Sequence, residues 1–360
     1  MMKIVFLIPD NVAGGAERVM TSIANELAII GHDIYLINFS GTNDFYSLNN
    51  MVHNIGLNIN DAGKRGVRKY ILFPKYYNAL YSCLINIKPD AVISFIFMTN
   101  IVGVICCHQL KIKIFISERN DPNRYTWLQS KFMKLFYPMA DGFVCQSDIV
   151  KTIVEKRYGI RNCIVIPNPL TREQVNIPAT IKKNIIIAVG RLIPQKNFAM
   201  LIAAFSELEE IKNNYRLIIY GDGPLRTELE RQITDLRLRD KVFLPGIKKD
   251  AIKIHNDATL FILSSDFEGY PNVLVEAMAN GIPSIASDVP SGTVRELIKD
   301  GENGFIFPIR DKEKLKEKIR YSLSDKCDLK AIGNAAVEVY SRNKVSKIAI
   351  AWLNYIRTNG

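Results

Sequence analysis

The sequence predicts two α/β domains, each built on a doubly wound parallel sheet with helices on both faces. The chain has 360 residues, more than one ordinary hydrophobic core serves. Strand-like and helix-like stretches alternate along it, as parallel sheets with helical crossovers require. The segment Ile164–Ala179 instead holds several prolines and few periodic apolar residues, which predicts a linker. We therefore expect an N-terminal domain over residues 1–168 and a C-terminal domain over residues 169–343.

The first predicted domain begins with a buried strand. Lys3–Ile8 is an almost continuous apolar run, which is typical of a strand covered on both faces. A loop at 11–15 follows, and then apolar residues recur at three- and four-residue steps, which predicts a helix. Further strands are predicted at His32–Asn38, Ala91–Phe95, Ile112–Ser117 and Gly142–Gln146.

The second predicted domain repeats this alternation. Its strands are predicted at Asn184–Val189, Arg216–Tyr220, Lys241–Leu244, Thr259–Leu263 and Pro283–Ala286. An amphipathic helix within the C-terminal residues 344–360 is expected to pack back on the first domain. Ligands of such sheets bind at the carboxyl ends of the strands, so we expect a ligand cleft where the two domains face each other.

The composition is that of a globular protein with a basic surface. Hydrophobic residues make up 48% and charged residues 23%, which excludes a disordered chain. The formal net charge of +11 suits a phosphate-rich partner, either nucleic acid, an anionic lipid headgroup or a polyanionic substrate. The six cysteines form no C-x-x-C pair, and no apolar run reaches the roughly 18 residues that span a bilayer. We expect a cytoplasmic protein with reduced thiols.

The segment Ser264–Gly292 contains the strongest functional signal. A strand is predicted to end at Leu263 and a helix to begin near Asn272. The first backbone N–H groups of a helix lack partners within it and attract anions, so those of Asn272, Val273 and Leu274 should be free for a ligand. Glu268 lies in the loop and Glu276 in the helix. Carboxylates at these places can accept hydrogen bonds from the hydroxyls of a sugar and of a ribose.

This segment resembles the signature of glycosyltransferase family 4, retaining enzymes with the GT-B fold of two Rossmann-like domains. The family pattern has Glu-Gly, a short gap, Pro, an apolar turn, Glu-Ala and a Gly-x-Pro strand entry. The matching residues are Glu268, Gly269, Pro271, Glu276, Ala277, Gly281 and Pro283, followed by Ser287, Asp288 and Gly292. The resemblance implies that Gly269 and the start of the helix bind a sugar donor.

Two other segments match the family in the expected order. VGRLIPQKN places Arg191 and Lys196 where the family has its diphosphate-binding pair, although alone they would read as solvated cations. The turn that begins at Gly221 should be structural with some nucleotide contact. GGAER places Gly14 and Gly15 at a helix start, where the family loop meets the donor phosphate or the acceptor.

The string ISERND, which ends at Asp121, resembles members that build lipid-linked bacterial glycans, such as N-acetylgalactosaminyltransferases. We interpret Glu118, Arg119 and Asn120 as a cleft loop on the acceptor side. Many members have a His in this neighbourhood, and this chain has Arg119. The four His residues show no metal-ligand spacing and no Asp-x-Asp motif stands in a suitable setting. We expect no metal and no cofactor, with the cation pair in place of a divalent ion.

Two segments of the first domain mix basic and aromatic residues. They are Gly63–Tyr77 and Arg124–Phe136. This mixture suits an anionic membrane surface, and nucleic-acid binding or ordinary core packing uses the same residue types. Our hypothesis is that this surface docks on the inner face of the plasma membrane and receives a polyprenyl-diphosphate-linked acceptor.

The resemblance implies a retaining transferase that moves a hexose or N-acetylhexosamine from a nucleotide diphosphate sugar, with UDP as the nucleotide. Arg191 and Lys196 would stabilise the leaving diphosphate, Glu276 would hold the ribose, and Glu268 the donor sugar or its phosphate. One alternative is a nucleotide-sugar epimerase of the same fold. Another is a non-catalytic subunit that binds a partner transferase at the membrane. A nucleic-acid-binding role rests on charge alone and ranks last.

Overall fold

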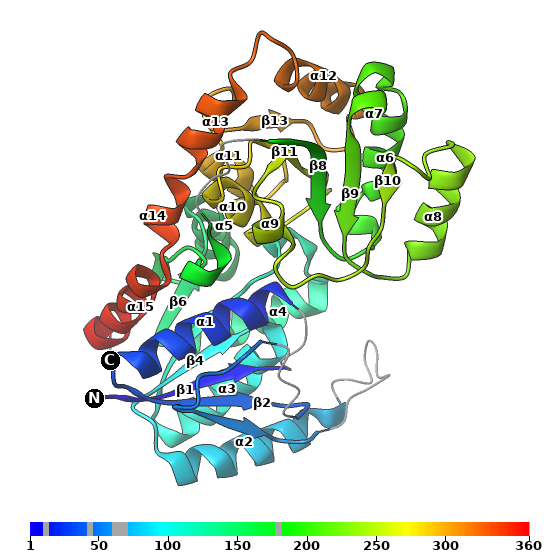
Figure 1. Cartoon of the computed structure of the whole chain (residues 1–360). Helices are drawn as coiled ribbons and strands as arrows, with labels where there is room; N and C mark the ends of the chain where they lie inside the picture. Colours follow the sequence, from blue (N-terminus) through cyan, green and yellow to red (C-terminus); the bar gives the residue numbers. More distant parts are fainter. Residues whose placement is uncertain (10–13, 42–45, 60–70, 177–181, 360) are drawn as a thin grey trace. The chain divides into compact units, whose positions relative to one another are not determined.

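The computed structural model describes residues 1–9, 14–41, 46–59, 71–176 and 182–359 (Figure 1). The chain forms two compact units. The first unit comprises Met1–Pro169 together with Asn343–Gly360, and the second comprises Leu170–Arg342. Each unit has its own parallel sheet and its own core, which confirms the predicted fold class.

Within its described residues, the first unit contains a seven-stranded parallel sheet in the order β3-β2-β1-β4-β5-β6-β7. Its strands are β1 Lys3–Ile8, β2 Asp33–Asn38, β3 Val52–Gly56, β4 Ala91–Phe95, β5 Lys113–Ser117, β6 Gly142–Cys145 and β7 Cys163–Val165. Its helices are α1 Gly15–Ile29, α2 Phe73–Ile87, α3 Phe97–Leu110, α4 Trp127–Phe136, α5 Asp148–Tyr158 and α15 Val345–Asn359.

The helices of the first unit cover both faces of its sheet. The helices α1 and α15 pack on one face, and α2 to α5 pack on the other. The C-terminal helix α15 is fixed by two large side chains. Trp352 is fully buried against Phe95, with 5.8 Å between ring centroids. The Tyr355 hydroxyl donates to the Asn162 carbonyl at 2.7 Å.

Within its described residues, the second unit contains a six-stranded parallel sheet in the order β10-β9-β8-β11-β12-β13. Its strands are β8 Lys183–Val189, β9 Arg216–Tyr220, β10 Val242–Phe243, β11 Ala258–Leu263, β12 Ser284–Ser287 and β13 Phe305–Phe307. Its helices are α6 Phe198–Ser206, α7 Glu209–Asn214, α8 Arg226–Asp235, α9 Ala251–Ile254, α10 Asn272–Ala279, α11 Thr293–Leu297, α12 Lys312–Ser322, α13 Leu329–Ala336 and α14 Val339–Asn343.

Both sheets reverse the direction in which strands are added next to their first strand. In the first unit this happens between β1 and β4, and in the second between β8 and β11. At such a switch point the loops that follow the two strands diverge to opposite faces, which leaves a crevice at their carboxyl ends. Each unit therefore has one place where its topology favours ligand binding.

The prediction missed three strands, and all three are edge strands. β3, β7 and β13 each lie at the end of a sheet. An edge strand has one neighbour and is partly exposed, so it lacks the continuous apolar run that marked the central strands. The linker prediction is wrong at its start, because β7 extends to Val165, and the units divide between Pro169 and Leu170. None of the described helices is long and apolar enough to cross a membrane.

Candidate active site

The residues predicted to be catalytic lie on two neighbouring loops of the second unit. One loop follows β8 and contains Arg191 and Lys196, and the other follows β11 and contains Glu268. Because β8 and β11 pair side by side at the switch point, both loops leave the sheet at the same edge. The site therefore lies where this topology places ligands.

A buried ion pair joins these two loops. The Lys196 Nζ atom lies 2.5 Å from Glu268 Oε1, and the two side chains are 14% and 9% exposed. The Ser265 hydroxyl donates to the same carboxylate oxygen at 2.6 Å. Removing a lysine and a carboxylate from water is costly unless they pair and gain further hydrogen bonds, and both conditions hold here. The sequence suggested separate roles for Lys196 and Glu268, and the structure brings them into contact.

Asp266 fixes the geometry of both loops. Its side chain accepts hydrogen bonds from Asn197 Nδ2 at 2.9 Å and from Arg310 Nε at 2.8 Å. Its backbone N–H donates to the Gln195 carbonyl at 2.8 Å. Sequence reasoning missed this residue, although it stands two positions before Glu268. Nothing in the sequence pairs it with Arg310, which follows β13 far along the chain.

Arg191 is the exposed cation of the site. It stands two residues beyond β8, and within the described part of the chain its side chain has no hydrogen-bond or ion-pair partner. Its planar guanidinium carries several N–H donors that match phosphate oxygens. The loop after β8 therefore presents a buried, paired cation at Lys196 and an exposed, unpaired one at Arg191.

The turn at Gly221 supports the loop that carries Arg191. Two hydrogen bonds join the turn to this loop, from Gly190 N to the Tyr220 carbonyl and from Leu192 N to the Asp222 carbonyl, both at 2.9 Å. A Cβ atom on Gly221 would lie 1.8 Å from the carbonyl oxygen of Gly190. The missing side chain at Gly221 lets the two backbones touch, which is a structural role.

Substitution of Gly221 by alanine should destabilise the second unit by about 2–3 kcal/mol, because one backbone segment must move to admit the methyl group. Gly301→Ala is the matched control. Gly301 also has a positive φ, of 81°, but a Cβ there would meet nothing within 4 Å. The midpoint of urea unfolding measures both variants. Equal midpoints would contradict the contact argument.

The prediction of free amides at the start of α10 is wrong for two of three residues. The helix begins at Asn272 as predicted. However, the Asn272 N–H donates to the Tyr270 carbonyl at 3.0 Å, and that of Leu274 donates to the Pro271 carbonyl at 2.9 Å. Pro271, at φ −80° and ψ 78°, forms an inverse γ-turn that consumes the first donor. Within the described residues, only Val273 of the three keeps an unpaired N–H.

Glu276 and Gly269 flank this turn. Gly269 is buried in the loop before it. Glu276 lies on α10 and is only 7% exposed. A carboxylate with so little contact to water is costly to bury unless polar groups surround it.

In the first unit, Glu118 and Arg119 turn inward from the end of β5. Glu118 Oε2 accepts from the Tyr137 hydroxyl at 2.7 Å, and burial raises the pKa of this carboxyl. The Arg119 guanidinium lies 3.8 Å from the Phe95 ring centroid, and burial lowers its pKa to about 9. Asn120 is the exposed member of the predicted acceptor loop.

Arg119 reaches the last residues of the first unit before the chain enters the second. Its Nη1 atom donates to Asn168 Oδ1 at 2.5 Å, and the Asn168 carbonyl accepts from Asn343 Nδ2 at 2.7 Å. Its Nε and Nη2 atoms are buried without a hydrogen-bond partner in the described part of the chain. Arg119 thus has a clear structural contact and keeps two donors unused.

The Glu17 carboxylate lies against the start of α1. Gly14 caps the helix and Gly15 is its first residue, as the sequence indicated. A Cβ atom on Gly14 would lie 1.9 Å from Glu17 Oε2, so this carboxylate folds back against the helix start. Part of the predicted loop, residues 11–13, lies outside the described residues.

Sequence reasoning also missed Ile96, which follows β4 at the switch point of the first unit. Its φ is 76°, a value that β-branched residues rarely adopt. Such backbone strain collects at ligand sites. Its carbonyl accepts from the Thr99 hydroxyl at 2.9 Å. No feature of the sequence marks this conformation.

Comparison with known protein families decides the identity of the chain. Residues 171–339 match the family model described as glycosyl transferases group 1, and residues 13–174 match that of glycosyltransferase family 4. The chain belongs to the family 4, group 1 glycosyltransferases. It is therefore a transferase enzyme, as the motifs around Arg191 and Glu268 predicted.

A relative and two solved structures are similar to this protein over the full chain, the structures in fold. This glycosyltransferase is 29% identical over 363 residues to a Campylobacter jejuni protein, covering 99% of this chain and 98% of the relative. That relative is named as an alpha-1,4-N-acetyl-D-galactosaminyltransferase acting on a diNAcBac-PP-undecaprenol-linked glycan. Sucrose-phosphate synthase from Thermosynechococcus elongatus has the same GT-B fold, with a TM-score of 0.87 at 18% identity and 99% coverage of both chains. Anabaena HepE, solved with UDP, gives a TM-score of 0.79 at 19% identity, with 99% of this chain and 100% of HepE covered.

Proposed function

We propose that this glycosyltransferase moves a hexose or N-acetylhexosamine from a UDP-linked donor to a lipid-linked glycan in the synthesis of a bacterial surface glycan. The observation that carries the donor half is the buried Lys196–Glu268 pair at the switch point of the second sheet, next to Arg191, which has no partner among the described residues. The name of the Campylobacter jejuni relative and the UDP in the HepE structure support the choice of acceptor and nucleotide.

In this mechanism the two cations meet the charge that develops on the leaving diphosphate. Arg191 is exposed and can bind phosphate oxygens directly, and the ion pair with Glu268 holds Lys196 in position. Such preorganised cations need no metal ion beside them. We place retention of the anomeric configuration in the same scheme, with the departing phosphate accepting the acceptor proton.

Glu268 has one oxygen left for the donor sugar. Its Oε1 atom is engaged by Lys196 and Ser265, whereas the one contact of Oε2 among the described residues is from Gln195 Nε2 at 3.5 Å. A sugar hydroxyl can donate to Oε2 without breaking the ion pair. Glu276, on the adjacent helix, is assigned to the ribose hydroxyls, and Val273 offers one free backbone donor to the phosphates.

In the acceptor half of this proposal, the enzyme works at the inner face of the plasma membrane as a peripheral protein. On α4, Trp127 is 72% exposed, and the Lys131 ammonium lies 3.9 Å from its ring centroid. Aromatic and basic side chains that share a surface suit the headgroup region of an anionic bilayer. The other basic segment, with Lys64, Arg65 and its neighbours up to Tyr70, lies outside the described residues.

Incubation of the purified enzyme with UDP-sugars, with and without an undecaprenyl-diphosphate-linked glycan, tests this function. We expect UDP release and a glycan longer by one sugar only when the acceptor is present. Isomerised sugar from the donor alone would instead establish an epimerase. Absence of UDP binding by calorimetry would favour a non-catalytic subunit.

A further inference from the structure

Three neighbouring helices of the first unit carry no acidic side chain. α2, α3 and α4 pack next to one another on one face of the sheet. Their sequences, FPKYYNALYSCLINI, FMTNIVGVICCHQL and WLQSKFMKLF, contain no Asp or Glu. Their Lys and His side chains are Lys75, His108, Lys131 and Lys134, and they contain no Arg. An ordinary solvated surface mixes both signs of charge, so this layer is unusual.

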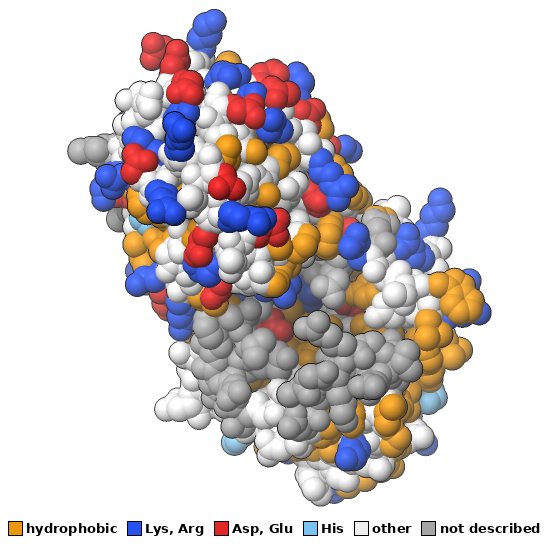
Figure 2. Space-filling view, turned by 90° about the vertical axis from the view of Figure 1, so that its right-hand side faces the viewer, with side chains coloured by type: hydrophobic (Ala, Val, Ile, Leu, Met, Phe, Trp, Pro, Cys, Tyr) orange, Lys and Arg blue, Asp and Glu red, His pale blue; other side chains and the backbone are white. Residues whose placement is uncertain are grey.

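The same layer exposes large apolar side chains. Trp127 and Leu135 of α4 are 72% and 65% exposed, and Leu128 and Ile85 are exposed as well. In Figure 2, hydrophobic and basic side chains lie side by side along the right-hand margin of the first unit, whereas red and blue are interspersed over the second. Apolar groups beside cations, without carboxylates, fit an anionic membrane surface.

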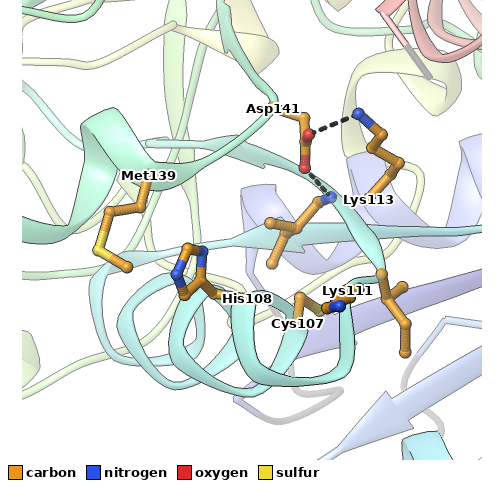
Figure 3. Close-up of a pocket in the computed structure, with 8 residues that line it drawn as sticks. Cys107, His108, Lys111, Lys113, Met139 and Asp141 are labelled. Atoms are coloured by element: carbon orange, nitrogen blue, oxygen red, sulfur yellow. Dashed lines mark hydrogen bonds and ion pairs between the residues drawn. The ribbon is translucent and has the colours of Figure 1, made fainter.

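A recess of about 400 Å³ opens at one end of this layer (Figure 3). It lies between the end of α3 and the start of β5, with His108, Lys111 and Lys113 on one side and Met139 on the other. The amino-terminal ends of the strands meet here. The predicted acceptor residues follow the carboxyl ends, so this recess is separate from that loop.

The recess has one unpaired lysine, Lys111, among the described residues. Asp141 is already satisfied, because its Oδ1 atom pairs with Lys113 Nζ at 3.0 Å and its Oδ2 atom accepts from the Ile114 N–H at 2.9 Å (Figure 3). Lys111 is exposed and has no ion-pair partner among the described residues. His108 adds a second polar group beside it in the lining. The available ligand chemistry is therefore that of a single phosphate.

We propose that this recess binds the phosphate of an anionic phospholipid when the α2–α4 layer rests on a bilayer. Met139, which follows α4 by three residues, joins the recess to the exposed apolar side chains of that helix. The lipid would place its phosphate against Lys111, with His108 beside it, and its glycerol and first methylenes along Met139. The inference rests on the proposed function only in placing the enzyme at a membrane.

Vesicle flotation tests the recess with Lys111→Asn. Asparagine tolerates the φ of 56° at this position, so the variant should fold. One lysine near an anionic surface contributes about 1 kcal/mol, so binding to phosphatidylcholine vesicles containing phosphatidylglycerol should fall about 5-fold. Wild-type protein should not bind vesicles of pure phosphatidylcholine. Soluble glycerol phosphate should not compete, since the layer and the recess act together.

Lys75→Asn is the matched control, because Lys75 lies on α2 in the same layer but does not line the recess. A smaller loss in this variant supports a headgroup site. Equal losses in both variants would overturn it, leaving only a general surface charge, and competition by glycerol phosphate would overturn the choice of a lipid. UDP release on a water-soluble acceptor should be unchanged in Lys111→Asn, so transfer itself is tested separately.

Discussion

Replacing Lys196 by methionine should lower kcat/KM for sugar transfer by about 10²- to 10³-fold, the loss typical of one preorganised group that stabilises transition-state charge. Methionine keeps most of the side-chain length and removes the ammonium. The effect should fall mainly on kcat, because the leaving diphosphate gains charge as the glycosidic bond breaks. Steady-state kinetics with a UDP-sugar and a lipid-linked acceptor measure it.

This substitution also leaves Glu268 buried without its cation, which could cost about 3–5 kcal/mol of stability. The double variant Lys196→Met with Glu268→Gln separates the two effects. It should regain much of the lost stability, because no buried charge remains unpaired, and it should stay as inactive as the single variant. Lys212→Met removes a lysine paired at 2.6 Å with Glu209 elsewhere in the second unit and should keep full activity. Recovered transfer in the double variant would show that Lys196 is only a structural partner.

The parts of this site that could be predicted from sequence are those whose residues lie close together along the chain. Arg191 and Lys196 fall on one short loop after a strand, and Glu268 and Glu276 flank one helix start, so motif order was enough to select them. The strands that lie inside the sheets were also predictable, because burial on both faces demands continuous apolar runs. Motifs and apolar runs of this kind lie within short segments, so they can be recognised without knowledge of the tertiary structure.

The parts that could not be predicted depend on residues distant in the chain. The clamp of Asp266 by Arg310 joins the loops after β11 and β13, and either residue alone looks like a solvated charge. The contact between Lys196 and Glu268 likewise follows from the pairing of β8 with β11, which the sequence does not state. The edge strands were not predicted because they are partly exposed and therefore lack a continuous apolar run.

The backbone N–H groups at the start of α10 show how a local turn can overturn a general rule about helices. A helix start after a loop ordinarily offers several free N–H groups. Here Pro271 forms an inverse γ-turn just before the helix, and the Asn272 N–H donates to the Tyr270 carbonyl. In the proposed function, the positive charge for the diphosphate therefore comes chiefly from Arg191 and Lys196. Donor binding is then expected to depend more on side-chain cations than on backbone N–H groups, so substitutions of these side chains test it directly.

Replacing Glu276 by alanine should weaken UDP binding about 10- to 150-fold, because hydrogen bonds between a charged group and ribose hydroxyls are worth about 1.5–3 kcal/mol. Titration calorimetry with UDP measures the loss. A second ligand, 2′,3′-dideoxy-UDP, tests the assigned contact, because it lacks the hydroxyls that Glu276 is proposed to hold. Wild-type enzyme should bind it more weakly than UDP, whereas Glu276→Ala should bind both ligands alike.

The comparison of the two ligands separates direct contact from a change in packing. Glu276 is nearly buried on α10, so its removal could also shift the helix. A shifted helix would weaken UDP and its dideoxy analogue by the same factor and leave their ratio at the wild-type value. A direct hydrogen bond predicts that this ratio falls to about one, since neither ligand then has a carboxylate to bind. A ratio that stays at the wild-type value would place the ribose elsewhere and assign Glu276 to the support of the helix.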